Sequence, residues 1–191
     1  AEELLQSRYA VEVTRIERLP VPYGLVRSGV APEHPKLKQP ILVYDRIARS
    51  QGFDYFGNVH VGRDVSVDDL RETHHGVIFA CGAEVDHKLG ISGESLSGSH
   101  SATEFVGWYN GHPDYCALTF DLTQEVVVIV GHGNVALDVA RILAKSVDGL
   151  RHTDIAEHAL DALAGSKIKE IHIFGRRGPA QAKFTSQELS E

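Results

Sequence analysis

The sequence of 191 residues has no methionine and only two cysteines, and several expected patterns are missing from it. Cys81 and Cys116 lie far apart and form no CxxC pair, which excludes a disulfide framework and a zinc ribbon. The eleven histidines form no HExxH or HxH motif, so we expect no metal site. No apolar run reaches the roughly 18 residues that a membrane-spanning helix needs.

Positive charge is also scarce. The chain has 19 Lys and Arg against 26 Asp and Glu, a formal net charge of −7. A nucleic acid or an anionic membrane would need a basic surface, so neither is expected as a partner. The 42% of hydrophobic and 24% of charged residues are typical of a globular chain, long enough for one domain or two small ones.

The residues that are present alternate between strand and helix patterns. Strands are predicted at 11–16, 76–80, 125–130 and 171–174, and helices at 41–50, 66–71, 101–110, 134–145 and 153–164. The run at 125–130 is almost wholly aliphatic, as in a strand that is buried on both faces of a parallel sheet. The alternation predicts an α/β fold with parallel sheets, and the turn-rich stretch 83–100 suggests a domain boundary.

A glycine motif follows the strand at 125–130. The sequence Gly-His-Gly-Asn-Val-Ala at 131–136 satisfies G-x-G-x-x-A and opens the helix at 134–145. Gly131 permits a tight turn, Gly133 lets the backbone approach a pyrophosphate, and Ala136 allows the helix to pack closely on the strand. The alternative is a glycine turn without a ligand, but the flanking strand and helix favour a dinucleotide site.

The residues after the next strand bear on the choice of cofactor. An NAD site would place an acidic residue there to hold the ribose, whereas this chain has Arg176 and Arg177. Two guanidinium groups suit the 2′-phosphate of NADP, because they form charge-assisted, bidentate hydrogen bonds. A solvated arginine pair at a strand end is the alternative.

Glu17 ends the first predicted strand, where the ribose-binding acid of a second nucleotide site would stand. The matching glycine loop should lie about 20 residues earlier. Together with the absence of methionine and a first helix without an N-cap, this leads us to expect that the sequence lacks the start of another Rossmann unit.

Four stretches carry a family resemblance: 19–35, 105–113, 131–143 and 175–185. In order and spacing they resemble the adrenodoxin reductase-like ferredoxin–NADP reductases, over essentially the whole chain. The resemblance implies Rossmann-like parallel sheets, with residues 1–88 as a partial FAD-binding domain and 89–191 as a partial, inserted NADP-binding domain. It also implies hydride transfer from NADPH to the flavin, followed by single-electron transfer to a ferredoxin-type iron–sulfur protein.

The same resemblance implies roles at matching positions. The implied cofactor-binding residues are Glu17, Leu25 and Val61 for FAD, and Gly131, His132, Gly133, Asn134, Val135, Arg176, Arg177 and Glu188 for NADP. His34 and Glu191 match a histidine–carboxylate pair near the flavin, with a structural loop histidine and a terminal acid as the alternative. His132 stands where the family often has Asn or Gln, although a backbone contact would survive that difference.

Three readings of the function follow. The first is an NADPH:ferredoxin oxidoreductase, inactive as these 191 residues alone because the flavin loop is missing. The second is an electron-input module of a larger complex, similar to the small subunit of glutamate synthase, and the third is a non-catalytic NADP-binding fragment. A cytoplasmic location is expected, or the mitochondrial matrix if the protein is eukaryotic.

Overall fold

A computed structural model describes residues 1–83, 85–176, 178 and 181–185. The chain folds into two compact units, the first formed by Ala1–Arg27 and Lys36–Glu84 and the second by Ser28–Pro35 and Val85–Glu191. Each unit is built on a short parallel sheet with helices, which confirms the predicted α/β fold class. The domain division at residue 88 remains a prediction.

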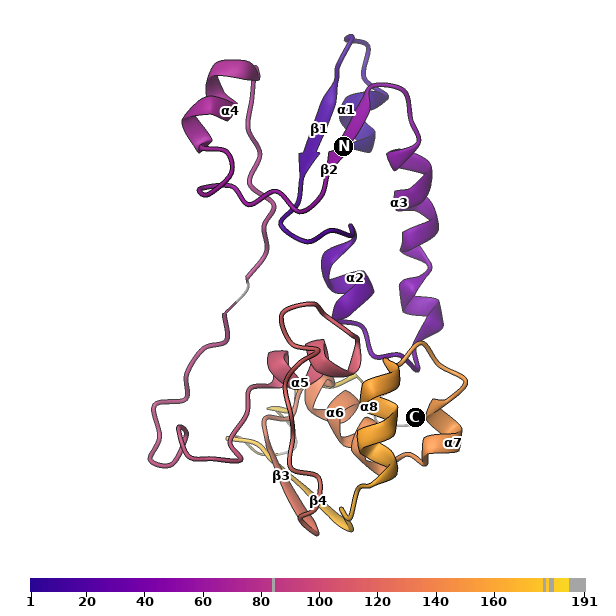
Figure 1. Ribbon diagram of the computed structural model, residues 1–191, viewed down its shortest axis with the longest axis vertical. Coiled ribbons are helices and arrows are strands. Elements are labelled where there is room, and N and C mark those ends of the chain that lie inside the picture. The colour runs from indigo at the N-terminus through magenta and orange to yellow at the C-terminus, as the bar shows by residue number, and fades with distance from the viewer. Residues whose placement is uncertain (84, 177, 179–180, 186–191) are drawn as a thin grey trace. The chain divides into compact units, whose positions relative to one another are not determined.

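The first unit contains a parallel pair of strands. Its elements are α1 (Glu2–Leu5), β1 (Val13–Ile16), α2 (Gly24–Ser28), the 3-10 helix η1 (Pro35–Lys38), α3 (Pro40–Ala48), β2 (Phe53–Phe56) and α4 (Val67–Thr73). The last residue of α2, Ser28, and the first residue of η1, Pro35, are counted with the second unit. β1 and β2 pair from Val13↔Phe53 to Ile16↔Phe56, because the intervening helical connection returns the chain in the same direction (Figure 1). None of the helices in the described residues is long and apolar enough to cross a membrane.

The second unit repeats the strand–helix–strand arrangement. Its elements are α5 (Ala102–Tyr109), β3 (Val126–Val130), α6 (Asn134–Ala144), α7 (Val147–Leu150), α8 (Glu157–Ala164) and β4 (Glu170–Phe174). β3 and β4 are parallel, in register from Val126↔Glu170 to Val130↔Phe174 (Figure 1). The carboxyl ends of both strands therefore lie together, where a parallel Rossmann-like sheet binds its ligand.

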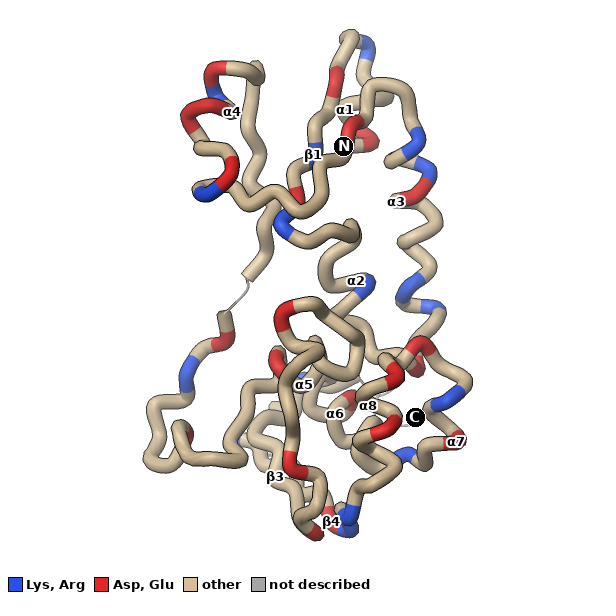
Figure 2. Tube along the Cα trace, in the orientation of Figure 1, with Lys and Arg blue, Asp and Glu red and all other residues tan. Residues whose placement is uncertain are grey.

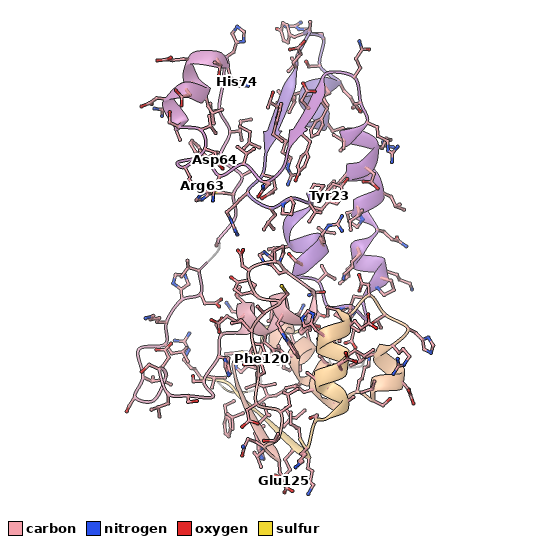
Figure 3. The ribbon with its side chains drawn as sticks, in the orientation of Figure 1. Tyr23, Arg63, Asp64, His74, Phe120 and Glu125 are labelled. Carbon is pink, nitrogen blue, oxygen red and sulfur yellow. The ribbon has the colours of Figure 1, made fainter. Side chains whose placement is uncertain are left out.

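The hydrophobic core of the described residues lies in this second unit. Helix α5 buries Phe105, Val106, Trp108 and Tyr109, and the ring of Phe120 lies 5.0 Å from those of both Phe105 and Trp108 (Figure 3). The rest of the core cluster comes mainly from α6, α7 and α8: Leu122, Val139, Ile142, Leu150, Ala159, Leu160 and Leu163. The core of this unit is thus formed mainly by the apolar faces of its helices.

The structure corrects three predictions about elements. Residues 76–80 form no strand, and Ile78 is 78% exposed. β3 is not buried on both faces, because Val126, Val128 and Val130 alternate with covered residues and remain about half exposed. The helix predicted at 153–164 begins at Glu157 after the N-cap Ala156, since the Thr153 side chain accepts from the backbone of Ile155 in a preceding turn. An apolar run is buried only where another element covers it, and the sequence of the run does not reveal whether one does.

Charged residues of both signs are interspersed along the trace. Figure 2 shows acidic and basic residues beside one another around α4, where Arg63 bonds Asp64 and Arg71 bonds Asp68. These are exposed pairs of small energetic value.

Candidate functional site

The junction of β3, the glycine loop and α6 forms the first part of the candidate site. The amide of Gly131 donates to the carbonyl of Phe174 at 2.7 Å, so the loop is fixed to the end of β4. Gly131 has a φ of +134°, a conformation that glycine adopts readily and side chains resist. Gly133 is the N-cap of α6 and provides no side-chain cap, so the first amides of the helix find no cap there.

The two glycines leave open space. A Cβ atom placed on Gly131 or Gly133 would meet nothing within 4 Å among the described residues. The N-terminus of an eleven-residue helix faces an anion favourably, through its amides and its dipole. The open backbone of the two glycines and the N-terminus of α6, which has no side-chain cap, therefore fit the pyrophosphate of a dinucleotide.

The end of β4 lies against the same loop. The imidazole of His132 packs directly on Gly175, since a Cβ on Gly175 would come within 1.5 Å of Cδ2 of His132. Within the described part of the chain, Nε2 of His132 is buried and has no hydrogen-bond partner. The contact joins the glycine loop to the strand end that carries Arg176, whereas Arg177 lies outside the described residues.

The segment after the arginines returns to the loop. The amide of Lys183 donates to the carbonyl of His132 at 3.2 Å, and the amide of Thr185 donates to Oδ1 of Asn134 at 3.1 Å. Sequence reasoning assigned Asn134 only a cofactor contact and missed this structural bond. Glu188 and Glu191 lie outside the described residues.

A cluster of ionic side chains connects the loop at 28–35 to α6, within the second unit. Nε of Arg141 donates to Oε1 of Glu33 at 2.5 Å, and Nη2 of Arg141 lies 2.8 Å from Nε2 of His34. Arg141 also bonds Asp138 one turn earlier, and the ammonium of Lys145 bonds Glu33. We call these five residues the α6 ion cluster. The sequence pattern indicated His34 alone, because helical spacing does not reveal which loop covers a helix.

Two pKa shifts accompany the cluster. Burial by itself would raise the pKa of the Glu33 carboxyl, but hydrogen bonds from Lys145 and Arg141 outweigh it and the pKa is lowered. Burial, with smaller contributions from the carboxylates of Asp138 and Glu33, raises the pKa of the Tyr109 hydroxyl far above its usual range. Glu33 is therefore ionised and Tyr109 neutral throughout the physiological pH range.

Glu33, His34 and Asp138 also bring three potential metal-ligand atoms within 4.8 Å of one another. The two carboxylates are already neutralised by Arg141 and Lys145. A metal ion would have to displace both cations, so the arrangement is an ion-pair network rather than a metal centre.

The first unit holds the residues predicted for FAD. Glu17 directly follows β1, and its carboxylate accepts from the amide of Leu19 at 3.4 Å and from Arg15 at 3.3 Å. Leu25 lies in α2 with an exposed side chain, and Val61 forms an isolated bridge to Val65. An acid at the end of the first parallel strand fits the ribose of a nucleotide, so Glu17 suits FAD at that point.

Comparison with known proteins identifies the family. No protein-family model matches the chain. It is 53% identical over its whole length to the mitochondrial NADPH:adrenodoxin oxidoreductase of Arabidopsis thaliana. Among solved structures, it matches FprA, a Mycobacterium tuberculosis oxidoreductase, with a TM-score of 0.96 and 48% identity over the whole chain and 42% of FprA. The chain therefore matches, over its whole length, members of the adrenodoxin reductase-like ferredoxin–NADP reductases.

Another structure of a family member, FprA of M. tuberculosis in complex with NADPH, matches 94% of this chain and 40% of its own, with a TM-score of 0.92 and 50% identity. The chain spans about 40% of the length of the Arabidopsis relative. The predicted family and fold are thus confirmed, whereas the roles of individual reductase residues remain predictions. The names of these relatives give no role to Glu17, His34 or Arg176.

Proposed function

We propose that the protein is an FAD-dependent oxidoreductase that passes electrons from NADPH to a ferredoxin-type iron–sulfur protein. The observation that carries the proposal is the strand–glycine loop–helix of β3 and α6, joined by His132 and Gly175 to a strand end that carries arginine. The names of relatives at about half identity support the same activity. We propose a cytoplasmic location, or the mitochondrial matrix if the protein is eukaryotic; the name of the Arabidopsis relative includes the word mitochondrial.

In this proposal the second unit binds NADP. When bound, NADPH supplies a hydride and FAD converts the electron pair into single electrons. Gly131 to Val135 would hold the pyrophosphate through backbone amides at the start of α6, with His132 and Asn134 contributing through their main chains. Arg176 and Arg177 would bind the 2′-phosphate, and Glu188 would contact the ribose on the nicotinamide side. Each role places a charge or a donor opposite the part of the dinucleotide that needs it.

The first unit would bind FAD. Glu17 would accept hydrogen bonds from the FAD ribose, while Leu25 and Val61 would contact the flavin nucleotide through their backbones. His34, with Glu191, would tune charge or relay a proton beside the flavin as the hydride moves.

Cofactor preference tests the proposal. In the full-length holoenzyme, replacing Arg176 and Arg177 with Gln should lower kcat/KM for NADPH a hundredfold or more and leave kcat/KM for NADH nearly unchanged. Each charge-assisted bond contributes about 1.5–3 kcal/mol, and NADH has no 2′-phosphate. Steady-state kinetics with both dinucleotides measure the effect.

The matched control is Arg151→Gln. Arg151 is also exposed in the second unit, but it follows α7 and pairs with Asp148 at 4.0 Å. This variant should leave both dinucleotides unaffected. Equal losses for NADPH and NADH in the double variant at 176 and 177 would show that these arginines are structural, and the NADP assignment would then fail.

Two alternatives share the same fold. An electron-input module of a larger complex, like the small subunit of glutamate synthase, would carry iron–sulfur cysteine clusters elsewhere in the full-length protein. A non-catalytic NADP-binding fragment would be colourless when purified. A yellow full-length protein that reduces ferredoxin with NADPH would exclude the second alternative and favour the reductase.

A further inference from the structure

One nitrogen of His34 faces two groups with opposite hydrogen-bonding needs. Nε2 lies 2.8 Å from Nη2 of Arg141 and 3.3 Å from Oδ1 of Asp138. Arg141 and Asp138 are also bonded to each other. The protonation state of this nitrogen therefore depends on which of the two neighbours it is hydrogen-bonded to.

The chemistry of the two neighbours separates the cases. A guanidinium has only N–H donors and stays charged at any ordinary pH, so Nε2 must offer its lone pair to Arg141. An ionised carboxylate has only acceptors, so Nε2 would need a proton to bond Asp138. A single ring nitrogen cannot meet both needs in the plane of the ring.

Distance and charge both favour Arg141. The contact to Arg141 is 0.5 Å shorter (2.8 against 3.3 Å), and Asp138 already accepts from the same guanidinium. The side chains of His34, Asp138 and Arg141 are only 10%, 15% and 12% exposed, so charges interact strongly there.

The neighbouring helix α5 contributes a neutral group to the described surroundings of the cluster: Tyr109 interacts with the same charges, and burial keeps its hydroxyl neutral. A protonated His34 would place a second positive charge 2.8 Å from the guanidinium of Arg141. Like charges at that distance in a buried site are unfavourable.

We infer that Arg141 is a positioning residue that fixes His34 as the neutral tautomer with its proton on Nδ1. Nε2 then accepts from Arg141, and the guanidinium, not an imidazolium, compensates the charge of Asp138. Arg141 reaches Glu33 through Nε and both His34 and Asp138 through Nη2. A lysine carries all its donors on one nitrogen and does not span these positions. For any reaction of His34, a proton can be given only from Nδ1 unless Arg141 moves.

Histidine-selective ¹⁵N NMR on the full-length holoenzyme at pH 7 tests the tautomer directly. The His34 resonances are assigned by their loss in His34→Gln. The expected spectrum shows protonated Nδ1 and unprotonated Nε2. A spectrum with the proton on Nε2, or with both nitrogens protonated, would overturn the inference without any variant at Arg141.

The variants then show whether Arg141 is the cause. Arg141→Gln should move the proton to Nε2, because the carboxylate of Asp138, 3.3 Å away, can then accept from it. Lys145→Gln is the matched control: it removes a cation that bonds Glu33, and it should leave the tautomer of His34 unchanged. An unchanged tautomer in Arg141→Gln, or an altered one in Lys145→Gln, would contradict the assignment.

A kinetic double-mutant cycle tests whether Arg141 affects flavin reduction through His34 or independently of it. This test rests on the proposed function. Arg141→Lys should slow flavin reduction by NADPH about tenfold in stopped flow, and should have no further effect in a His34→Gln background. Equal losses in both backgrounds would show that Arg141 acts independently of His34. If the unmodified holoenzyme shows no flavin reduction by NADPH, the proposed function fails, whereas the tautomer remains decided by NMR.

Discussion

At the scale of single residues, the site depends on two kinds of glycine. Among the described residues, none comes within 4 Å of a Cβ placed on Gly131 or Gly133, whereas Gly175 is covered by the ring of His132. The first two keep room for a ligand, and the third lets a protein side chain approach the backbone. The sequence alone gives all three the same letter, so their different roles follow from what lies beside them.

Gly175→Ala should destabilise the second unit by about 1–3 kcal/mol, because the new methyl group would lie 1.5 Å from Cδ2 of His132 and the loop would have to shift. Denaturant unfolding measures the loss. His132→Ala in the same chain removes the clash and should recover most of the stability. A double variant no more stable than Gly175→Ala would mean that another contact is responsible.

The contrasting substitution is Gly133→Ala, where a Cβ meets nothing within 4 Å. Since Gly133 is the N-cap of α6, this change should alter stability by less than about 1 kcal/mol. NADP binding should weaken, because the methyl group fills the proposed pyrophosphate cradle. Unchanged affinity, measured by titration calorimetry, would argue against a ligand at this loop.

Glu33→Gln should destabilise the second unit by about 3–5 kcal/mol at pH 7, because Arg141 and Lys145 lose a buried counter-charge. The pKa of Glu33 is lowered in the folded protein, so its contribution is present above its ordinary value of 4.5 and is lost as pH falls through the folded value. Unfolding curves of both proteins should therefore converge below pH 4.5. Glu125→Gln, in an exposed pair with Lys169, should cost under about 1 kcal/mol at every pH.

At the scale of elements, two helices begin with the same capping box but differ in burial. Ser101 accepts from the amide of Glu104 at the start of α5, and Ser66 accepts from that of Asp69 at the start of α4. Helix α5 buries five of its residues, whereas α4 buries none. Identical local chemistry therefore supports a core helix in one unit and a surface helix in the other.

Ser101→Ala should lower the global stability of the second unit by about 1 kcal/mol, since the loss of the cap weakens a helix that the core requires. Ser66→Ala removes an equivalent cap and should only increase local fraying of α4. Thermal unfolding followed by Trp108 fluorescence reports the first effect, and amide exchange of α4 reports the second. A comparable shift of the Trp108 transition in both variants would refute this distinction.

At the scale of the whole molecule, apolar burial is unevenly distributed. All thirteen buried hydrophobic residues among those described lie in the second unit, including Ala31 in the loop at 28–35. The first unit holds its two strands together with partly covered side chains. The two units should therefore differ in stability, since apolar burial is the main favourable contribution to folding.

Amide exchange of the 191-residue chain should show this difference. Amides of β3, α6 and α8 should exchange slowly and with one common free energy of opening, while those of β1 and β2 should exchange faster. Val139→Ala in α6 should accelerate exchange throughout the second unit and leave β1 and β2 unchanged. Equal protection in both sheets would contradict a difference in core size.

The α/β class, the glycine loop after β3, the helix α6, the arginine at the end of β4 and the family resemblance could all be predicted from the amino-acid sequence. These features are local: a short aliphatic run, glycine spacing and helical periodicity fix the backbone within a few residues. The same local patterns were wrong for residues 76–80 and for the second face of β3, because burial depends on a partner that the run itself does not specify.

The contacts between side chains that are distant in the sequence could be known only from the folded structure. It placed His34 against Asp138 and Arg141, more than 100 positions away in the sequence, and packed His132 on Gly175. Contacts of this kind depend on how a loop packs against a helix. The sequence of the loop does not specify which helix it will cover, and the sequence of the helix does not specify the loop. The chemistry of each group is set by its residue type, but its tautomer and charge are set by the neighbours that folding brings within hydrogen-bond distance.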